Sequence, residues 1–87
     1  MPPQGVLEGE LSFSSVPGLL QRADTLLDGG VLDLSRVSRV DSAGLALLLE
    51  LSRRSQSRGT RLRIRGADPQ ILRLAGFFGL DNVLNFE

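Results

Sequence analysis

The chain has 87 residues, of which 41% are hydrophobic, and its ten basic residues balance ten acidic ones. One domain is the most that this length supports, and the neutral charge gives no general attraction to nucleic acid or anionic lipid. There is no cysteine for disulfides, thiol nucleophiles or thiolate metal sites, and no histidine for metal binding or proton transfer near neutral pH. Only carboxylates, hydroxyls and guanidiniums remain for chemistry, which argues against an enzyme without excluding one, and we expect neither a metal nor a cofactor.

The termini and the apolar runs give no sign of membrane insertion or secretion. No apolar run approaches the roughly 18 residues of a membrane span. The first residues lack the charged region followed by an apolar region that marks a secretory signal. We expect residues 1–5 to be a flexible tail and residues 6–87 to form a single domain in the cytoplasm.

The first half of that domain alternates between strand and helix patterns. Residues 6–13 are a plausible strand, in which Gly9 marks a bulge. Residues 16–27 place apolar side chains at helical spacing, with Pro17 in the first turn, and Asp28 and two glycines follow. A short buried strand over residues 31–34 and a connecting loop over residues 35–41 come next.

The second half repeats this alternation. Residues 42–57 form a long leucine-rich helix, and residues 61–65 alternate strictly between arginine and apolar side chains, as in a half-buried strand. Asp68 and Pro69 begin a third helix that ends at Gly79, and residues 83–86 form a last short strand. Strands that alternate with helices predict an α/β fold with a largely parallel sheet and crossover helices.

A helical-wheel count divides the long helix into two faces. At about 100° per residue, the predicted core face carries Leu45, Leu48, Leu49, Leu51 and Ser52. The opposite face carries Ala43, Leu47, Glu50 and Arg54. Leu47 is then either a lone exposed leucine, which is common, or an apolar anchor for a partner.

The turn before this helix combines an acidic residue with small ones. Asp41 is placed to accept N–H bonds from the first helical turn and to favour the positive end of the helix dipole. Gly44 has no Cβ, so another backbone or a partner can approach closely there. Both residues are predicted to support the helix start.

The stretch from Asp33 to Leu45 resembles the signature of STAS domains, the family of anti-sigma factor antagonists and of sulfate transporter tails. That signature reads Asp, apolar, Ser, then Asp-Ser-Ser/Thr-Gly and a leucine-rich helix. It is met here by Asp33, Leu34, Ser35, Asp41, Ser42, Gly44 and Leu45. The resemblance implies an α/β STAS-like fold with a four- or five-stranded mixed, largely parallel sheet and helices packed mainly on one face.

Within the family, residues 33–41, 44–49 and 74–80 are most similar to the small STAS subunit of the Gram-negative phospholipid ABC transport system. That system maintains outer-membrane lipid asymmetry. The resemblance implies a non-catalytic subunit that docks on the transporter's cytoplasmic ATPase and stabilises or regulates it. It further implies a position peripheral to the inner membrane through this partner, without direct membrane insertion.

The alternative implied by the resemblance is an anti-sigma factor antagonist that an anti-sigma factor kinase phosphorylates. In such proteins the first hydroxyl after the aspartate is modified, and that position is Ser42 here. The next position is usually Ser or Thr in antagonists but is Ala43 in this chain. Three interpretations of Ser42 stay open: a hydroxyl serving the helix start, a partner contact and a phosphorylation site.

We predict a partner-binding surface made of Ser42, Ala43, Leu47, Phe77 and Phe78. The two phenylalanines lie about 100° apart on a helix, so one of them should lie at the core margin, where aromatics often anchor interfaces. The alternative is that both are core residues. Arg53, Arg54 and Arg58 either pair with the negative helix end or meet an acidic partner or lipid headgroup.

Overall fold

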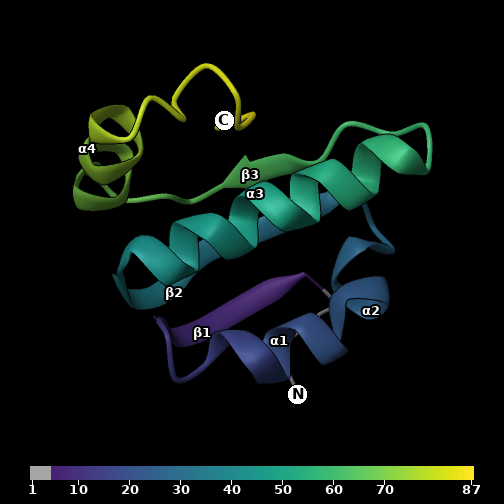
Figure 1. The fold of residues 1–87 in the computed structure, drawn as a ribbon, viewed down its shortest axis with the longest axis horizontal. Helices are drawn as coiled ribbons and strands as arrows, with labels where there is room; N and C mark the ends of the chain where they lie inside the picture. The colour runs from purple at the N-terminus through teal and green to yellow at the C-terminus, as the bar shows by residue number, and fades with distance from the viewer. Residues whose placement is uncertain (1–4) are drawn as a thin grey trace.

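The computed structural model describes residues 5–87 and has an α/β fold (Figure 1), as predicted. The elements follow in the order β1 (Val6–Leu11), α1 (Val16–Gln21), α2 (Ala23–Leu27), β2 (Val31–Val40), α3 (Ser42–Ser57), β3 (Arg63–Arg65) and α4 (Pro69–Phe77). The predicted tail over residues 1–5 lies outside the described residues except for Gly5, whose carbonyl accepts the N–H of Asp33 at 2.8 Å.

The sheet has three parallel strands in the order β1-β2-β3 rather than the four or five that were predicted. The predicted strand over residues 83–86 contributes a single parallel bridge, between Phe86 and Ile64. Its pairing is short because the chain turns just before it, where the N–H groups of Val83 and Leu84 both bond to the carbonyl of Leu80.

Strand β2 continues six residues beyond the predicted strand over residues 31–34 and takes in most of the predicted loop. The reason is its partner, because β1 pairs with β2 up to Leu11 and Val40, with register shifts on either side of Glu8 and Gly9. Long-range pairing of this kind leaves little signal in the local sequence. Its consequence is that β2 delivers the chain directly to the start of α3.

The predicted helix over residues 16–27 is divided into α1 and α2 at Arg22, whose φ of −100° and ψ of 12° are not helical. Helix α1 buries none of its residues fully, whereas α2 buries Ala23, Leu26 and Leu27. Both helices contact α3, which itself packs on β1 and β2. In Figure 1, α4 stands at the end of the molecule where α3 begins.

The prediction that Leu47 faces away from the core is wrong, because its side chain is only 2% exposed. Leu49, which was predicted to be buried, is 38% exposed instead. Arg58 lies about three turns beyond Leu47 on the same flank of α3, and it pairs with Asp24 of α2. The short helices therefore cover the flank that a wheel of α3 alone leaves open.

Gly44 explains how closely α3 rests on the sheet. A Cβ at this position would lie 2.2 Å from the carbonyl oxygen of Leu11, at the end of β1. The close approach predicted for Gly44 is therefore taken by the protein's own backbone. Because the first turn of α3 lies against β1, the turn between β2 and α3 has a fixed position.

Candidate docking site

Asp41 organises the turn at the start of α3, as predicted. Its Oδ1 accepts the N–H of Gly44 at 3.0 Å and caps the helix, while its Oδ2 accepts the N–H of Phe13 at 3.2 Å. Its own N–H donates to the carbonyl of Leu11 at 3.1 Å. One aspartate thereby joins the end of β1, the loop after β1 and the first turn of α3.

The carboxyl group of Asp41 is held in its ionised form. The N–H of Gly44 contributes most to lowering the pKa of Asp41 below its ordinary value of 3.8. Partial burial acts in the opposite direction, and the N–H of Phe13 and the charge of Arg39 lower the pKa further. A carboxylate that is stabilised as an anion by backbone donors serves structure, since it does not readily take up a proton.

Ser42 and Ala43 follow this cap and remain at the surface, Ser42 exposed and Ala43 half-buried. The carboxylate of Asp41 accepts the capping hydrogen bond, so the helix start does not require the hydroxyl of Ser42. Leu47, the third predicted contact on α3, is buried and cannot touch a partner in the folded state. The accessible part of the predicted α3 surface is therefore its first turn alone.

Phe77 and Phe78 both lie outside the core, which excludes the alternative that both are core residues. Phe77 is 82% exposed and Phe78 is 50% exposed. Their rings meet edge to face, with centroids 5.3 Å apart and planes at 85°. This arrangement is favourable for aromatic pairs, so each ring stabilises the orientation of the other at the C-terminal end of α4.

Phe13 is a further exposed aromatic that the sequence analysis did not single out. It is 83% exposed in the loop after β1, where its N–H is bonded to Asp41. The loop is tied down by Ser15, whose Oγ accepts the N–H of Ser12 at 2.9 Å and donates to the carbonyl of Glu10 at 2.7 Å. In the sequence, the sign of this residue is a phenylalanine flanked by serines, because a polar loop has no apolar contacts of its own for such a side chain.

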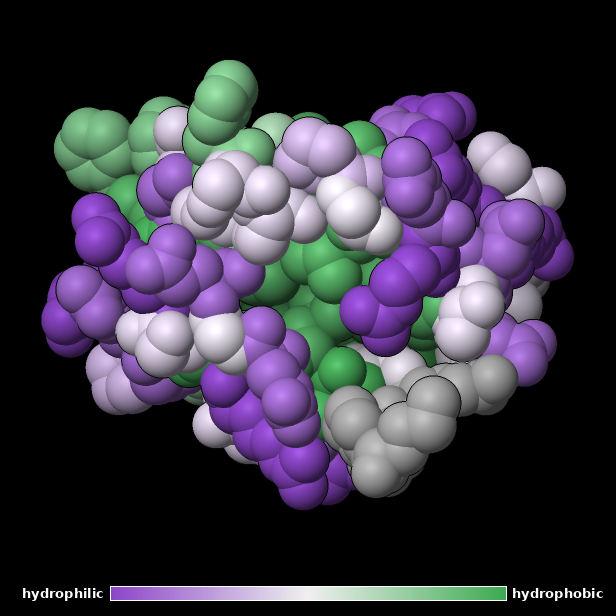
Figure 2. Space-filling model, turned by 90° about the horizontal axis from the view of Figure 1, so that it is seen from below, coloured by the Kyte–Doolittle hydropathy of each residue, from purple (hydrophilic) through white to green (hydrophobic). Residues whose placement is uncertain are grey.

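A hollow of about 520 Å³ connects the turn at Asp41 with α4. Its walls are formed by Arg39, Val40, Asp41, Gln70, Arg73, Leu74 and Phe77. Phe77 therefore borders the same hollow as Asp41, and the loop after β1 is bonded to Asp41 through the N–H of Phe13. In the space-filling view, green apolar surface appears at the upper left, the end of the molecule that carries α4 in Figure 1 (Figure 2).

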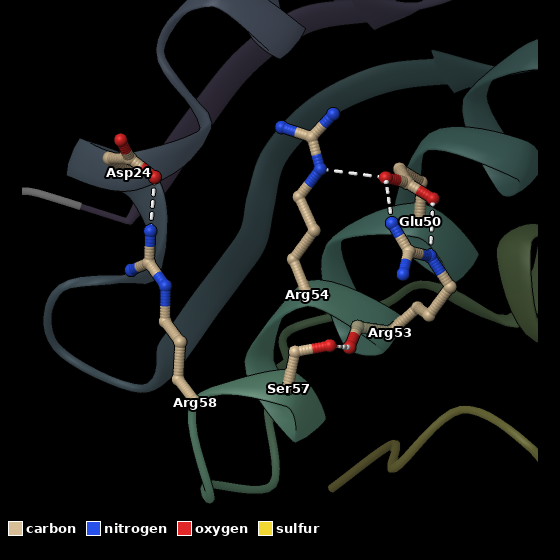
Figure 3. A network of polar contacts seen from close by, with 6 residues as sticks. All are labelled: Asp24, Glu50, Arg53, Arg54, Ser57 and Arg58. Atoms are coloured by element: carbon tan, nitrogen blue, oxygen red, sulfur yellow. Dashed lines mark hydrogen bonds and ion pairs between the residues drawn. The ribbon is translucent and has the colours of Figure 1, made fainter.

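The arginines at the far end of α3 are engaged within the protein (Figure 3). Arg53 and Arg54 both bind Glu50, with Nε to carboxylate distances of 2.9 and 2.6 Å, and Arg58 pairs with Asp24. The pairing is therefore with acidic side chains rather than with the helix end. Each of these arginines therefore already has an acidic partner, although Arg53 and Arg54 share the one carboxylate of Glu50.

None of the helices in residues 5–87 combines the length and the apolar character that a membrane crossing requires. In the same part of the chain, acidic side chains do not gather in any group of three or more that could hold a metal ion. What the described surface offers near α3 is exposed aromatic rings, a serine hydroxyl and guanidinium groups.

Comparison with known proteins places this architecture among STAS domains. The family described as "Mlab, STAS domain" matches residues 5–85. The intermembrane phospholipid transport system binding protein MlaB of Escherichia coli (strain K12) is 36% identical, over 85% of this chain and 77% of that protein. The protein of the same name from Haemophilus influenzae is 35% identical, over 92% of this chain and 84% of its own length.

Among solved structures, the chain resembles the anti-sigma factor antagonist SpoIIAA in its unphosphorylated form. The TM-score is 0.71 and the identity is 22%, and the match covers 94% of this chain and 76% of that one. At this identity the likeness concerns the fold alone.

Proposed function

Because this chain belongs to the MlaB-type STAS domain family, we propose that it is the non-catalytic STAS subunit of a phospholipid ABC transport system. In this proposal it docks on the transporter's cytoplasmic, MlaF-like ATPase subunit and stabilises or regulates it. The relatives that support the proposal carry the name of a phospholipid transport system binding protein. The complex would act in maintaining outer-membrane lipid asymmetry.

The docking face, as we define it, consists of Phe13, Ser42, Ala43, Phe77 and Phe78. The observation that carries the proposal is the position of two phenylalanines, each more than four-fifths exposed, on separate segments that both adjoin Asp41. Exposed aromatic side chains are costly in water and are frequent hot spots of interfaces. Ser42 and Ala43 are small and accessible, so a partner can approach the first turn of α3 closely.

A purely binding role agrees with the side chains available on this face. The carboxylate of Asp41 is committed to backbone donors, and the sequence has neither histidine nor cysteine to move protons or attack a substrate. We place the protein on the cytoplasmic side of the inner membrane, where it is peripheral and held by its partner.

The proposal is tested by measuring the affinity of the purified protein for the ATPase subunit of the same transport system. We expect a stable complex, and we expect Phe77→Ala to weaken it by about 2 kcal/mol or more, as hot-spot truncations do. Leu72→Ala is the matched control, since Leu72 is a 42% exposed apolar residue on another side of α4. The absence of a complex would refute the proposal, and equal losses from both variants would refute the docking face.

A second candidate function is a phosphorylation switch, as in anti-sigma factor antagonists. It is favoured by one observation, the exposure of Ser42 at the start of α3 while Asp41 caps the helix. A phosphate there would add about −1.5 to −2 charges beside Asp41. Intact mass spectrometry after incubation with an anti-sigma factor kinase tests this second function. Phosphorylation must appear in the wild type and be absent from Ser42→Ala.

A further inference from the structure

Two arginines, Arg39 and Arg73, line the hollow beside the docking face. Arg39 lies one residue before the end of β2, and Arg73 lies one turn before Phe77 on α4. Both residues line the hollow of about 520 Å³ together with Phe77 and Asp41. The hollow thus combines positive charge with an aromatic wall, at the end of the molecule where α3 begins.

These two arginines differ from most of the others in forming no ion pair within residues 5–87. Of the ten arginines, five form ion pairs within residues 5–87, namely Arg36, Arg53, Arg54, Arg58 and Arg63. Among the other five, only Arg39 and Arg73 line this hollow. The carboxylate of Asp41 also borders it but accepts two backbone N–H groups, and two guanidiniums against one carboxylate leave one uncompensated positive charge.

We propose that this hollow, the Arg39–Arg73 pocket, receives an acidic side chain of the ATPase subunit. The inference rests on the proposed function and specifies how the partner is recognised. A guanidinium binds a carboxylate through paired hydrogen bonds, and such charge-assisted bonds are stronger than neutral ones. Phe77 and Leu74 provide apolar wall for the stem of a glutamate or for an apolar neighbour of the acidic residue.

The pocket also sets the register of docking. On docking, aromatic rings bury surface area but tolerate small shifts of the partner. A carboxylate between two arginines is held in one position. Because the pocket lies open to water, the contact should be sensitive to salt. We therefore expect the pocket to contribute to affinity and to partner choice, in addition to the area that the aromatic rings bury.

The test uses isothermal titration calorimetry of the wild-type protein and its variants against the ATPase subunit of the same transport system. Arg39→Glu and Arg73→Glu are each expected to raise Kd by about tenfold or more, and Arg73→Lys by less. Rising salt should weaken the wild-type complex more than the complex of the double charge-reversal variant. Arg61→Glu is the matched control, because Arg61 is exposed, has no ion pair in residues 5–87 and follows the opposite end of α3.

The outcomes separate the pocket from the proposed function. If the wild type does not bind the ATPase, both are overturned. If the wild type binds but Arg39→Glu and Arg73→Glu bind equally well, the pocket inference alone is overturned, and the same holds if Arg61→Glu loses as much affinity. Sedimentation with phosphatidylglycerol vesicles completes the test. Vesicle binding that requires both arginines, with ATPase affinity unchanged, would assign the pocket to a lipid headgroup instead.

Discussion

The backbone N–H of Phe13 donates to Oδ2 of Asp41 at 3.2 Å, across 28 positions of the sequence. This bond attaches the exposed ring of Phe13 to the residue that caps α3. The loop after β1 and the first turn of α3 therefore form one unit, although they belong to different parts of the chain. The proposed docking face is built on that unit, and Phe77 of α4 lines the same hollow as Asp41.

Asp41→Ala is expected to separate the two parts of this unit. It removes the acceptor of the Phe13 and Gly44 N–H groups, so both amides should exchange with deuterium faster and the partner affinity should fall. Ser42→Ala is the control for fold and exchange, since Ser42 does not cap the helix. Unchanged protection of the Phe13 amide in Asp41→Ala would show that the loop is held by other means.

Leu47 and Leu49 provide a matched pair for testing which flank of α3 is buried. Leu47→Ala should lower the free energy of unfolding by about 2–5 kcal/mol, because it leaves a cavity under α1 and α2. Leu49→Ala should lower it far less, because Leu49 is 38% exposed. Urea denaturation measures both, and equal losses would contradict the burial described for α3.

Gly44 and Gly76 form a second matched pair on helices. Gly44→Ala should destabilise the protein by about 1–3 kcal/mol, because its Cβ would meet the carbonyl of Leu11 and force α3 away from β1. Gly76→Ala has open space around it and should stabilise the protein by about 0.5–1 kcal/mol through helix propensity. Thermal denaturation that moves both melting temperatures in the same direction would argue against the close contact at Gly44.

Acid should weaken the charge cluster that Glu50, Arg53 and Arg54 form on α3. Arg53 and Arg54 lower the pKa of Glu50 from 4.5 to about 2. Since the folded-state pKa is the lower one, the stabilisation is complete above about pH 4.5 and is lost as the pH falls toward 2. The cluster is exposed, so the effect is small and screened by salt.

The measurement is the melting temperature of the wild type and of Glu50→Gln across this pH range. The wild type should be the more stable at neutral pH, and the difference should shrink from about pH 4.5 downward and disappear as the pH falls through about 2. A difference that stays constant with pH would mean that the carboxylate charge of Glu50 contributes nothing to stability.

Local patterns in the sequence predicted the elements better than their contacts. The predicted bounds of the long helix, residues 42–57, agree with α3, and Asp41 caps it as expected. Strand β2 was predicted too short because its second half depends on pairing with β1, which no local pattern records. Leu47 and Leu49 were assigned to the wrong sides because a wheel for one helix cannot include the neighbours that cover its flank.

The candidate site was predictable only in part, for a similar reason. Ser42 and the phenylalanine pair were found from motif and spacing, and all three are accessible. Phe13, Arg39 and Arg73 were not found, because tertiary contacts rather than a local sequence pattern bring them to the site. Arg39 and Arg73 are 34 positions apart, and only the packing of α4 beside the end of β2 brings them to one hollow.

Photo-cross-linking of the complex tests the central claim most directly. A photoreactive phenylalanine analogue replaces Ser42 in one variant and Arg61, which follows the other end of α3, in a second. If the start of α3 is the docking surface, the probe at position 42 will form a covalent adduct with the ATPase subunit and the probe at position 61 will not. An adduct from position 61 alone, in a complex of wild-type affinity, would place the partner on a different face and contradict the account.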